Sequence, residues 1–295
     1  MAGQGENSDD MMWKIILAGI PLLAAIVAVA LAYCSRRWQS ATKEMHARLE
    51  ASRLPIGSGT YSSEELSVLP APVQRYFRAV LKDGQPMISA VSLEQTGAFN
   101  MSETGEQWRP FTSTQRGVTR RPGFDWEARI VMMPGLTARV HDAYIAGEGI
   151  LHATLFGLAS LANMRGSPEA AHGEFMRFFA EAVWYPTALL PSQGAHWDAV
   201  DNTSARAALK DGETSLTMPF RFNEHGFIES VHGEARGRTV AGAVIPTPWE
   251  ARCRNYELRN GMRIPIEAEA AWILPEGTKP YWRGRVSRLS YEFAQ

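Results

Sequence analysis

Two histidines and an aspartate are the residues of this chain whose types could most directly do chemistry. His141 and Asp142 are adjacent, and His152 follows on the next predicted strand. Two imidazoles and a carboxylate on neighbouring strands could bind a metal ion or relay a proton. Successive side chains of a strand point to opposite faces, so His141 and Asp142 would need a bulge between them to serve one site. We therefore predict no metal site here.

Other catalytic residue types also lack their usual surroundings. No serine lies in a GxSxG motif, and the glycine before Ser160 is one position too far away. Cys253 has no activating motif beside it in the sequence. Residues 233–237, GEARG, lack the lysine of a phosphate-binding loop. We predict no catalytic residue and no cofactor, which favours a protein that is not an enzyme. A hydrolase whose residues converge from distant positions stays open.

The charge balance and the cysteine content exclude further classes. The chain has 30 basic and 31 acidic residues, so no global positive field points to nucleic acid. Its two cysteines, Cys34 and Cys253, lie far apart and form no CxxC motif, which implies neither a disulfide framework nor a thiolate zinc site. Nine tryptophans, eight tyrosines and twelve phenylalanines could fill a large core or line a cavity.

An uncharged run at residues 15–33 predicts one transmembrane helix. At about 19 residues it is long enough to cross the hydrocarbon core of a bilayer. Trp13 before it and Arg36 after it belong to the groups that settle at headgroup level. A cleavable signal peptide is disfavoured because the preceding residues are acidic and the run is long, and Tyr33 before Cys34 argues against a lipoprotein signal.

The chain divides into four predicted segments around this helix. They are an acidic tail at residues 1–14, the transmembrane helix at 15–34, a basic stalk and linker at 35–59, and one β-rich domain at 60–295. More basic residues follow the span than precede it. The positive-inside rule taken alone therefore places the domain in the cytoplasm.

The folded domain begins with a helix and continues as strands. Pro72 can occupy the first turn of a short helix that ends before Asp83. From Met87 onward the apolar period is two, and glycine-rich turns such as Asn260-Gly261 separate the runs. Short loops between strands mean antiparallel pairing. We predict a mainly β fold, a curved antiparallel sheet of about a dozen strands.

One helical insertion interrupts the strands and could act as a lid. Ser167 and Pro168 fit its N-cap and first position, and phenylalanines recur at helical spacing until Pro186. Arg177 and Glu181 share another face, where they could meet a ligand headgroup or form a solvated ion pair. The candidate ligand-binding residues are the aromatic and acidic side chains of this segment with two strand tryptophans: Phe175, Phe178, Phe179, Glu181, Trp184, Tyr185, Trp249 and Trp272. Ordinary core packing is the alternative for the helix and for both strand tryptophans.

Several motifs, in order, resemble an uncharacterised family of bacterial membrane-anchored proteins defined by a domain of unknown function. The motifs are LPAPVQRYFRAV at residues 69–80, FFAEAVWYPTALLP at 178–191, HWDAVDNTSARAAL at 196–209, TPWE at 247–250, GMRIP at 261–265 and YWRG at 281–284. The resemblance covers most of the domain and implies a bacterial inner-membrane location. It implies no activity and no catalytic residues.

The order of elements is also similar to periplasmic lipoprotein carriers and related lipid-binding domains. In that fold a curved antiparallel sheet wraps a hydrophobic cavity, and helices act as a lid. The FRFNEHGFIESV hairpin at residues 221–232 looks like the hairpin in the second half of those domains. This likeness implies a periplasmic domain, against the charge rule, so the side of the membrane stays open.

Two functions follow as expectations. The first is a single-pass membrane protein that binds a hydrophobic or amphiphilic ligand, such as a lipid or acyl chain, without covalent chemistry. The second is a protein-interaction or assembly module at the membrane, with a filled core and an exposed apolar patch. An apolar cavity of about 300 Å³ or more under the helix would favour the first.

Overall fold

Thirteen strands form one continuous antiparallel sheet in the computed structural model of the chain, which describes residues 6–57, 59–157 and 159–294. The predicted fold class, a mainly β protein with about a dozen antiparallel strands, is confirmed. The strands are β1 Ile88–Asn100, β2 Trp108–Val118, β3 Gly123–Met133, β4 Leu136–Ile145, β5 Glu148–Leu155, β6 Ala159–Arg165, β7 His196–Ala199, β8 Ser204–Asp211, β9 Thr214–Phe222, β10 Ile228–Val240, β11 Ala243–Arg259, β12 Met262–Leu274 and β13 Gly277–Phe293.

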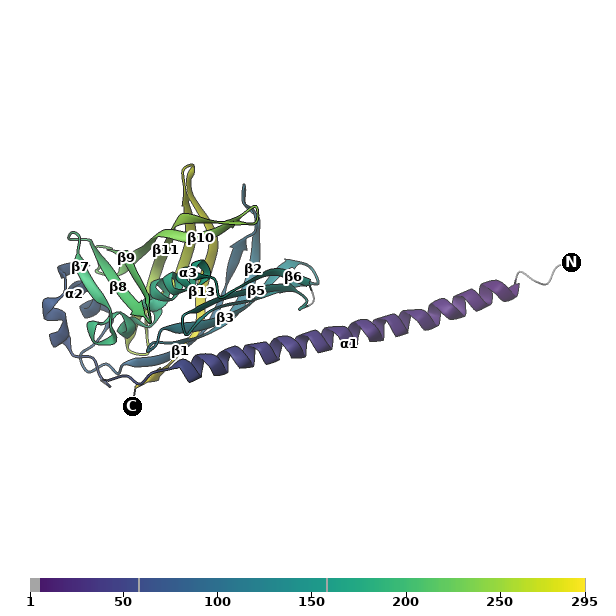
Figure 1. Ribbon diagram of the computed structural model, residues 1–295, viewed down its shortest axis with the longest axis horizontal. Coiled ribbons are helices and arrows are strands. Elements are labelled where there is room, and N and C mark those ends of the chain that lie inside the picture. Colours follow the sequence, from purple (N-terminus) through teal and green to yellow (C-terminus); the bar gives the residue numbers. More distant parts are fainter. Residues whose placement is uncertain (1–5, 58, 158, 295) are drawn as a thin grey trace.

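The strand order places the first and last strands at the centre of the sheet. β1 pairs with β13; β2 to β6 run outward from β1 to one edge, and β12 to β7 run outward from β13 to the other. The chain must therefore pass from the β6 edge to the β7 edge. Helix α3, Pro168–Glu181, and the short turns η2 Ala182–Trp184, η3 Pro186–Leu189 and η4 Pro191–Gln193 make that connection, and the sheet curves around α3 (Figure 1).

Helix α3 is fixed by its first residues and by its aromatic face. The Ser167 side chain accepts a hydrogen bond from the Ala170 amide, and Pro168 occupies the first turn, as predicted. Phe175 stacks on Tyr144 of β4, with ring centroids 5.1 Å apart. The helix thus packs on the inner face of the sheet and forms one core with it.

A close approach between α3 and β5 requires a glycine. A Cβ at Gly149 would lie 2.3 Å from the Ala170 carbonyl carbon. Any side chain at this position of β5 would push the start of α3 away from the sheet. At the other side of the domain, η1 Ser63–Val68 and α2 Ala71–Val80 cover the core, with Val73 and Phe77 of α2 buried.

Helix α1 contains both the predicted span and the predicted stalk. It runs as one helix of 47 residues, Glu6–Ser52, which is about 70 Å long at the α-helical rise. The N-terminal part of this helix projects beyond the sheet (Figure 1). Among the described residues it is the one helix long and apolar enough to cross a membrane, although a signal sequence passes the same test.

The C-terminal part of α1 packs on the outer face of the sheet. Leu49 is fully buried there, in a small cluster with side chains of β1, β2, β4 and β5. The Trp38 ring stacks on His141 at 4.0 Å, and Trp38 Nε1 donates a 2.7 Å hydrogen bond to Glu127. The basic segment after the span is therefore helical and docked on the domain, up to the break after Ser52.

Candidate functional site: a cavity between α3 and the sheet

A cavity of about 400 Å³ lies between α3 and the inner face of the sheet. It exists because small side chains face it from several elements. β11 contributes Ala251 and Cys253, β12 contributes Ala268 and Ala270, and α3 contributes Ala180. A row of larger residues at these positions would fill the space. The volume falls in the range of small-molecule pockets.

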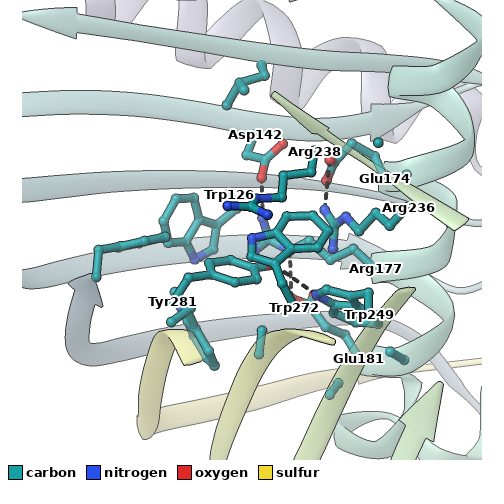
Figure 2. Close-up of a pocket in the computed structure, with 18 of the residues that line it drawn as sticks. Trp126, Asp142, Glu174, Arg177, Glu181, Arg236, Arg238, Trp249, Trp272 and Tyr281 are labelled. Atoms are coloured by element: carbon teal, nitrogen blue, oxygen red, sulfur yellow. Dashed lines mark hydrogen bonds and ion pairs between the residues drawn. The ribbon is translucent and has the colours of Figure 1, made fainter. Parts of the chain in front are cut away.

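Aromatic rings form much of the cavity wall. Trp249 of β11, Trp272 of β12 and Tyr281 of β13 lie side by side on the sheet, and the Trp272 and Tyr281 rings stack at 5.1 Å (Figure 2). Trp249 Nε1 donates a 2.9 Å hydrogen bond to the Tyr281 hydroxyl, so both polar groups are satisfied within the wall. Trp126 of β3 and Trp184 of η2 add further apolar surface.

A buried ion cluster joins α3 to the sheet along the cavity. Arg177 donates from Nη1 to Asp142 Oδ2 at 2.6 Å and from Nε to Glu181 Oε1 at 2.7 Å. Arg236 of β10 donates to Glu174 Oε1 at 3.0 Å. The side chains of these five residues are only 10–15% exposed. A buried guanidinium with paired carboxylates holds the helix in register on the sheet.

Both arginines of the cluster also lie on aromatic faces. The Arg177 guanidinium lies 4.8 Å from the Phe124 ring centre and 4.9 Å from that of Trp126. The Arg236 guanidinium lies 5.0 Å from the Trp249 ring. Such cation–π contacts add to the ion pairs of these buried side chains.

The protonation state makes the ion cluster electrically balanced at neutral pH. Burial and the nearby Asp142 carboxylate together raise the pKa of Glu174 to about 8, against the lowering effect of Arg236 and Arg177. Glu174 is therefore mostly protonated at pH 7. The two arginines are then matched by the Asp142 and Glu181 carboxylates.

The predicted ligand-binding residues divide into two groups. Glu181, Trp184, Trp249 and Trp272 line the cavity. Phe175, Phe178, Phe179 and Tyr185 do not; they are at most 1% exposed and pack in the core. Tyr185 donates its hydroxyl hydrogen to the Phe178 carbonyl at 2.9 Å. The second group holds the helix in place, and a ligand contact for any of the eight stays a prediction.

The alternative of a solvated ion-paired face on α3 is wrong. Arg177 and Glu181 form an ion pair at the predicted i,i+4 spacing, but the pair faces the cavity. Arg177 also pairs with Asp142, which is 35 residues away in the sequence. Sequence reasoning also missed Arg236 and the cavity-facing alanines. The signal for the latter was the EAEAA pattern of β12, where small residues occupy the inward positions.

His141 and Asp142 point to opposite faces of β4, as the alternation of side chains along a strand predicted. Asp142 faces the cavity, whereas His141 lies on the outer face beneath Trp38, with Thr42 Oγ1 2.8 Å from its Nε2. Burial lowers the pKa of His141 to about 3, so it is neutral. His152 pairs with His141 in register and lies near the same tryptophan. No group of three or more potential metal ligands occurs among the described residues.

The cysteine in the cavity wall is not activated. Cys253 is buried, and burial raises the pKa of its thiol to about 12. A thiol rather than a thiolate faces the cavity at neutral pH, and only the thiolate is a strong nucleophile. The cavity wall therefore presents no activated nucleophile at Cys253, and its apolar surface could accommodate an apolar molecule.

Comparison with known proteins identifies a family. The model of a family described as "Family of unknown function (DUF6920)" matches residues 67–291, about three quarters of the chain. The resemblance to a family defined by a domain of unknown function is thereby confirmed. No curated protein matches the sequence.

Solved structures with a similar arrangement include two bacterial proteins. A LolA superfamily protein from Nitrosomonas europaea is 10% identical, with a TM-score of 0.38; the match covers 75% of this chain and 92% of that one. A domain of a predicted outer membrane lipoprotein-sorting protein from Vibrio parahaemolyticus is 12% identical, also with a TM-score of 0.38; the match covers 69% and 85%.

Proposed function

We propose that this chain, which belongs to the DUF6920 family of unknown function, binds one hydrophobic or amphiphilic molecule, such as a lipid or acyl chain, in the cavity beneath α3. The observation that carries the proposal is the cavity itself, about 400 Å³ with tryptophans and alanines in its wall. A pocket with mostly apolar walls and a few polar groups is the usual form of a small-molecule site. An assembly module would need no such internal space.

Binding requires no covalent chemistry in this proposal. Burying an acyl chain contributes about 25 cal/mol per Å² of apolar surface removed from water. The ion cluster around Arg177 holds α3 on the sheet, so the cavity keeps its shape when it is empty. The balanced charge of that cluster leaves the apolar wall as the main source of affinity.

The same proposal assigns α1 to the membrane. Its apolar side chains between Ile20 and Tyr33 are exposed to the surroundings rather than packed on the domain. The docked part from Trp38 to Ser52 would hold the cavity close to the bilayer, so a ligand could pass between the two. The exposed Arg36 and Arg37 favour a cytoplasmic domain under the positive-inside rule. Protease access to a C-terminal tag in sealed vesicles tests this side.

Photo-crosslinking tests whether an acyl chain occupies the cavity. The full chain in phosphatidylcholine nanodiscs would be labelled with a diazirine-bearing fatty acid, and the labelled peptides would be mapped by mass spectrometry. We expect labels on β11, β12 and α3. Ala251→Phe places a ring in the cavity and should reduce this labelling at least about tenfold, the equivalent of 1.4 kcal/mol.

A matched variant separates filling of the cavity from general damage. Ala243→Phe introduces the same ring at the exposed start of the same strand and should leave the labelling unchanged. Labels confined to α1, or equal labelling of both variants, would overturn the proposed site.

A further inference from the structure

One arginine in the cavity wall lacks the acidic partner that its neighbours have. Arg236 pairs with Glu174, and Arg283 pairs with Glu269 at 2.8 Å. Arg238 lines the same cavity but forms no ion pair with any described residue. Its guanidinium instead lies 6.0 Å from the Trp272 ring centre, and Figure 2 shows the two side chains next to each other.

A lysine beside the same tryptophan is also without a partner. Lys279 pairs with Trp272 in the antiparallel register of β12 and β13, which puts both side chains on one face of the sheet. Lys279 Nζ is buried and has no hydrogen-bond partner among the described residues. A buried ammonium with nothing to accept its hydrogen bonds is costly, and a bound anion would satisfy it.

Arg238 lies toward the open part of the cavity, and Lys279 lies beside Trp272 on the same face of the sheet. Arg238 is half-buried, its neighbour Thr239 is exposed, and Val244, which also lines the cavity, is 44% exposed. The ion cluster around Arg177, by contrast, is buried and balanced. A charged ligand group placed there would have to break existing pairs, whereas one placed beside Arg238 would complete an unpaired site.

We propose that Arg238 and Lys279 form an anion subsite flanking Trp272, which binds the carboxylate or phosphate headgroup of an amphiphile whose chain fills the cavity. The assignment rests on the proposed function and narrows its ligand class to anionic amphiphiles. Arg238 supplies a planar pair of donors suited to a carboxylate or phosphate, and Lys279 supplies a compact point charge. The exposed side next to Thr239 leaves room for the headgroup.

A set of ligands with one chain and different headgroups tests the subsite. Dodecanoate, dodecyl phosphate, 1-dodecanol and inorganic phosphate would each compete with the photoreactive fatty acid for the full chain in phosphatidylcholine nanodiscs. We expect both anionic amphiphiles to compete at least about tenfold better than the alcohol, and inorganic phosphate to compete poorly. In Arg238→Gln/Lys279→Gln the preference for the anions should disappear, while competition by the alcohol should stay.

The controls distinguish the subsite from the cavity. Arg288→Gln removes an exposed arginine of the same strand as Lys279 and should keep the preference. Equal competition by dodecanoate and dodecanol in the wild-type chain, or an unchanged preference in the double variant, would overturn the subsite and leave the cavity proposal intact. Inorganic phosphate as effective as dodecyl phosphate would overturn the headgroup assignment. Absence of any labelling would overturn both proposals.

Discussion

Arg177 is the residue on which the packing of α3 against the sheet most depends. It donates to Asp142 on β4 and to Glu181 on its own helix, and it lies between the rings of Phe124 and Trp126. Each partner is almost fully removed from water. The net contribution of such a cluster to the free energy of folding is small, but the loss of one member leaves the others as unpaired buried charges.

Removal of this guanidinium should therefore destabilise the domain strongly. We expect Arg177→Met to lower the free energy of unfolding by about 3–5 kcal/mol, because Asp142 and Glu181 would stay buried without their cation. Urea unfolding followed by tryptophan fluorescence measures the change. Arg288→Met removes an exposed surface pair and should cost about 0.5 kcal/mol or less. Similar losses in the two variants would contradict the importance of the cluster.

The raised pKa of Glu174 makes the stability of the folded chain depend on pH. Its pKa is raised from 4.5 to about 8 in the folded chain, so between these values the folded state binds more protons than the unfolded state. The contribution of Glu174 to stability then falls as the pH rises from about 5 to 8. Glu174→Gln keeps the uncharged form and should flatten this part of the profile. Thermal unfolding at pH 5 and pH 8 measures it, and an equally steep decline in the variant would refute the assignment.

At the scale of elements, the interface between α1 and the outer face of the sheet also responds to pH. His46 Nε2 lies 3.1 Å from Asp125 Oδ2, and Asp125 is fully buried. The contact with Asp125 raises the pKa of His46, and burial raises the pKa of Asp125. Both groups bind protons more tightly when the helix is docked. The docked state is favoured below the ordinary His46 pKa of 6.5 and loses stability as the pH rises above it.

Because the docked state loses stability as the pH rises, we predict looser docking of α1 in mildly basic solution. Amide hydrogen exchange of residues 38–52, corrected for the intrinsic rate, should speed up between pH 6 and pH 8.5 in the wild-type chain. His46→Gln should remove most of that dependence. His225→Gln changes an exposed turn histidine and should behave as the wild type does. A pH response that survives in the His46 variant would show that another group controls the docking.

The elements and the position of a cavity beneath the helical insertion were largely predictable, and most of the residues that line the cavity were not. Ser167, Pro168 and the phenylalanine spacing set α3 through local chemistry, and the period of two set the strands. The cavity depends on which residues meet across the sheet. Asp142 reaches Arg177 only because β4 lies beneath α3 in the fold. The EAEAA alternation marks Ala268 as facing inward, but it does not tell whether this alanine faces a void or a neighbouring side chain.

At the scale of the whole molecule, topology places the cavity where a single connection covers the sheet. β1 and β13 meet at the centre, so the one link between the two outer edges has to cross a face, and α3 is that link. Helix α1 lies on the opposite face and continues into the apolar span. The sheet thus separates a face that holds a cavity from a face that holds the helix proposed to enter the membrane.

Native mass spectrometry of the full chain released from nanodiscs tests the central claim most directly. If the cavity beneath α3 binds an amphiphile, the wild-type chain should carry one added mass that corresponds to a single acyl-chain molecule. Ala251→Phe should lack it, and Ala243→Phe should retain it. A wild-type chain that is empty even after incubation with excess fatty acid, or an adduct that persists in Ala251→Phe, would contradict ligand binding in this cavity.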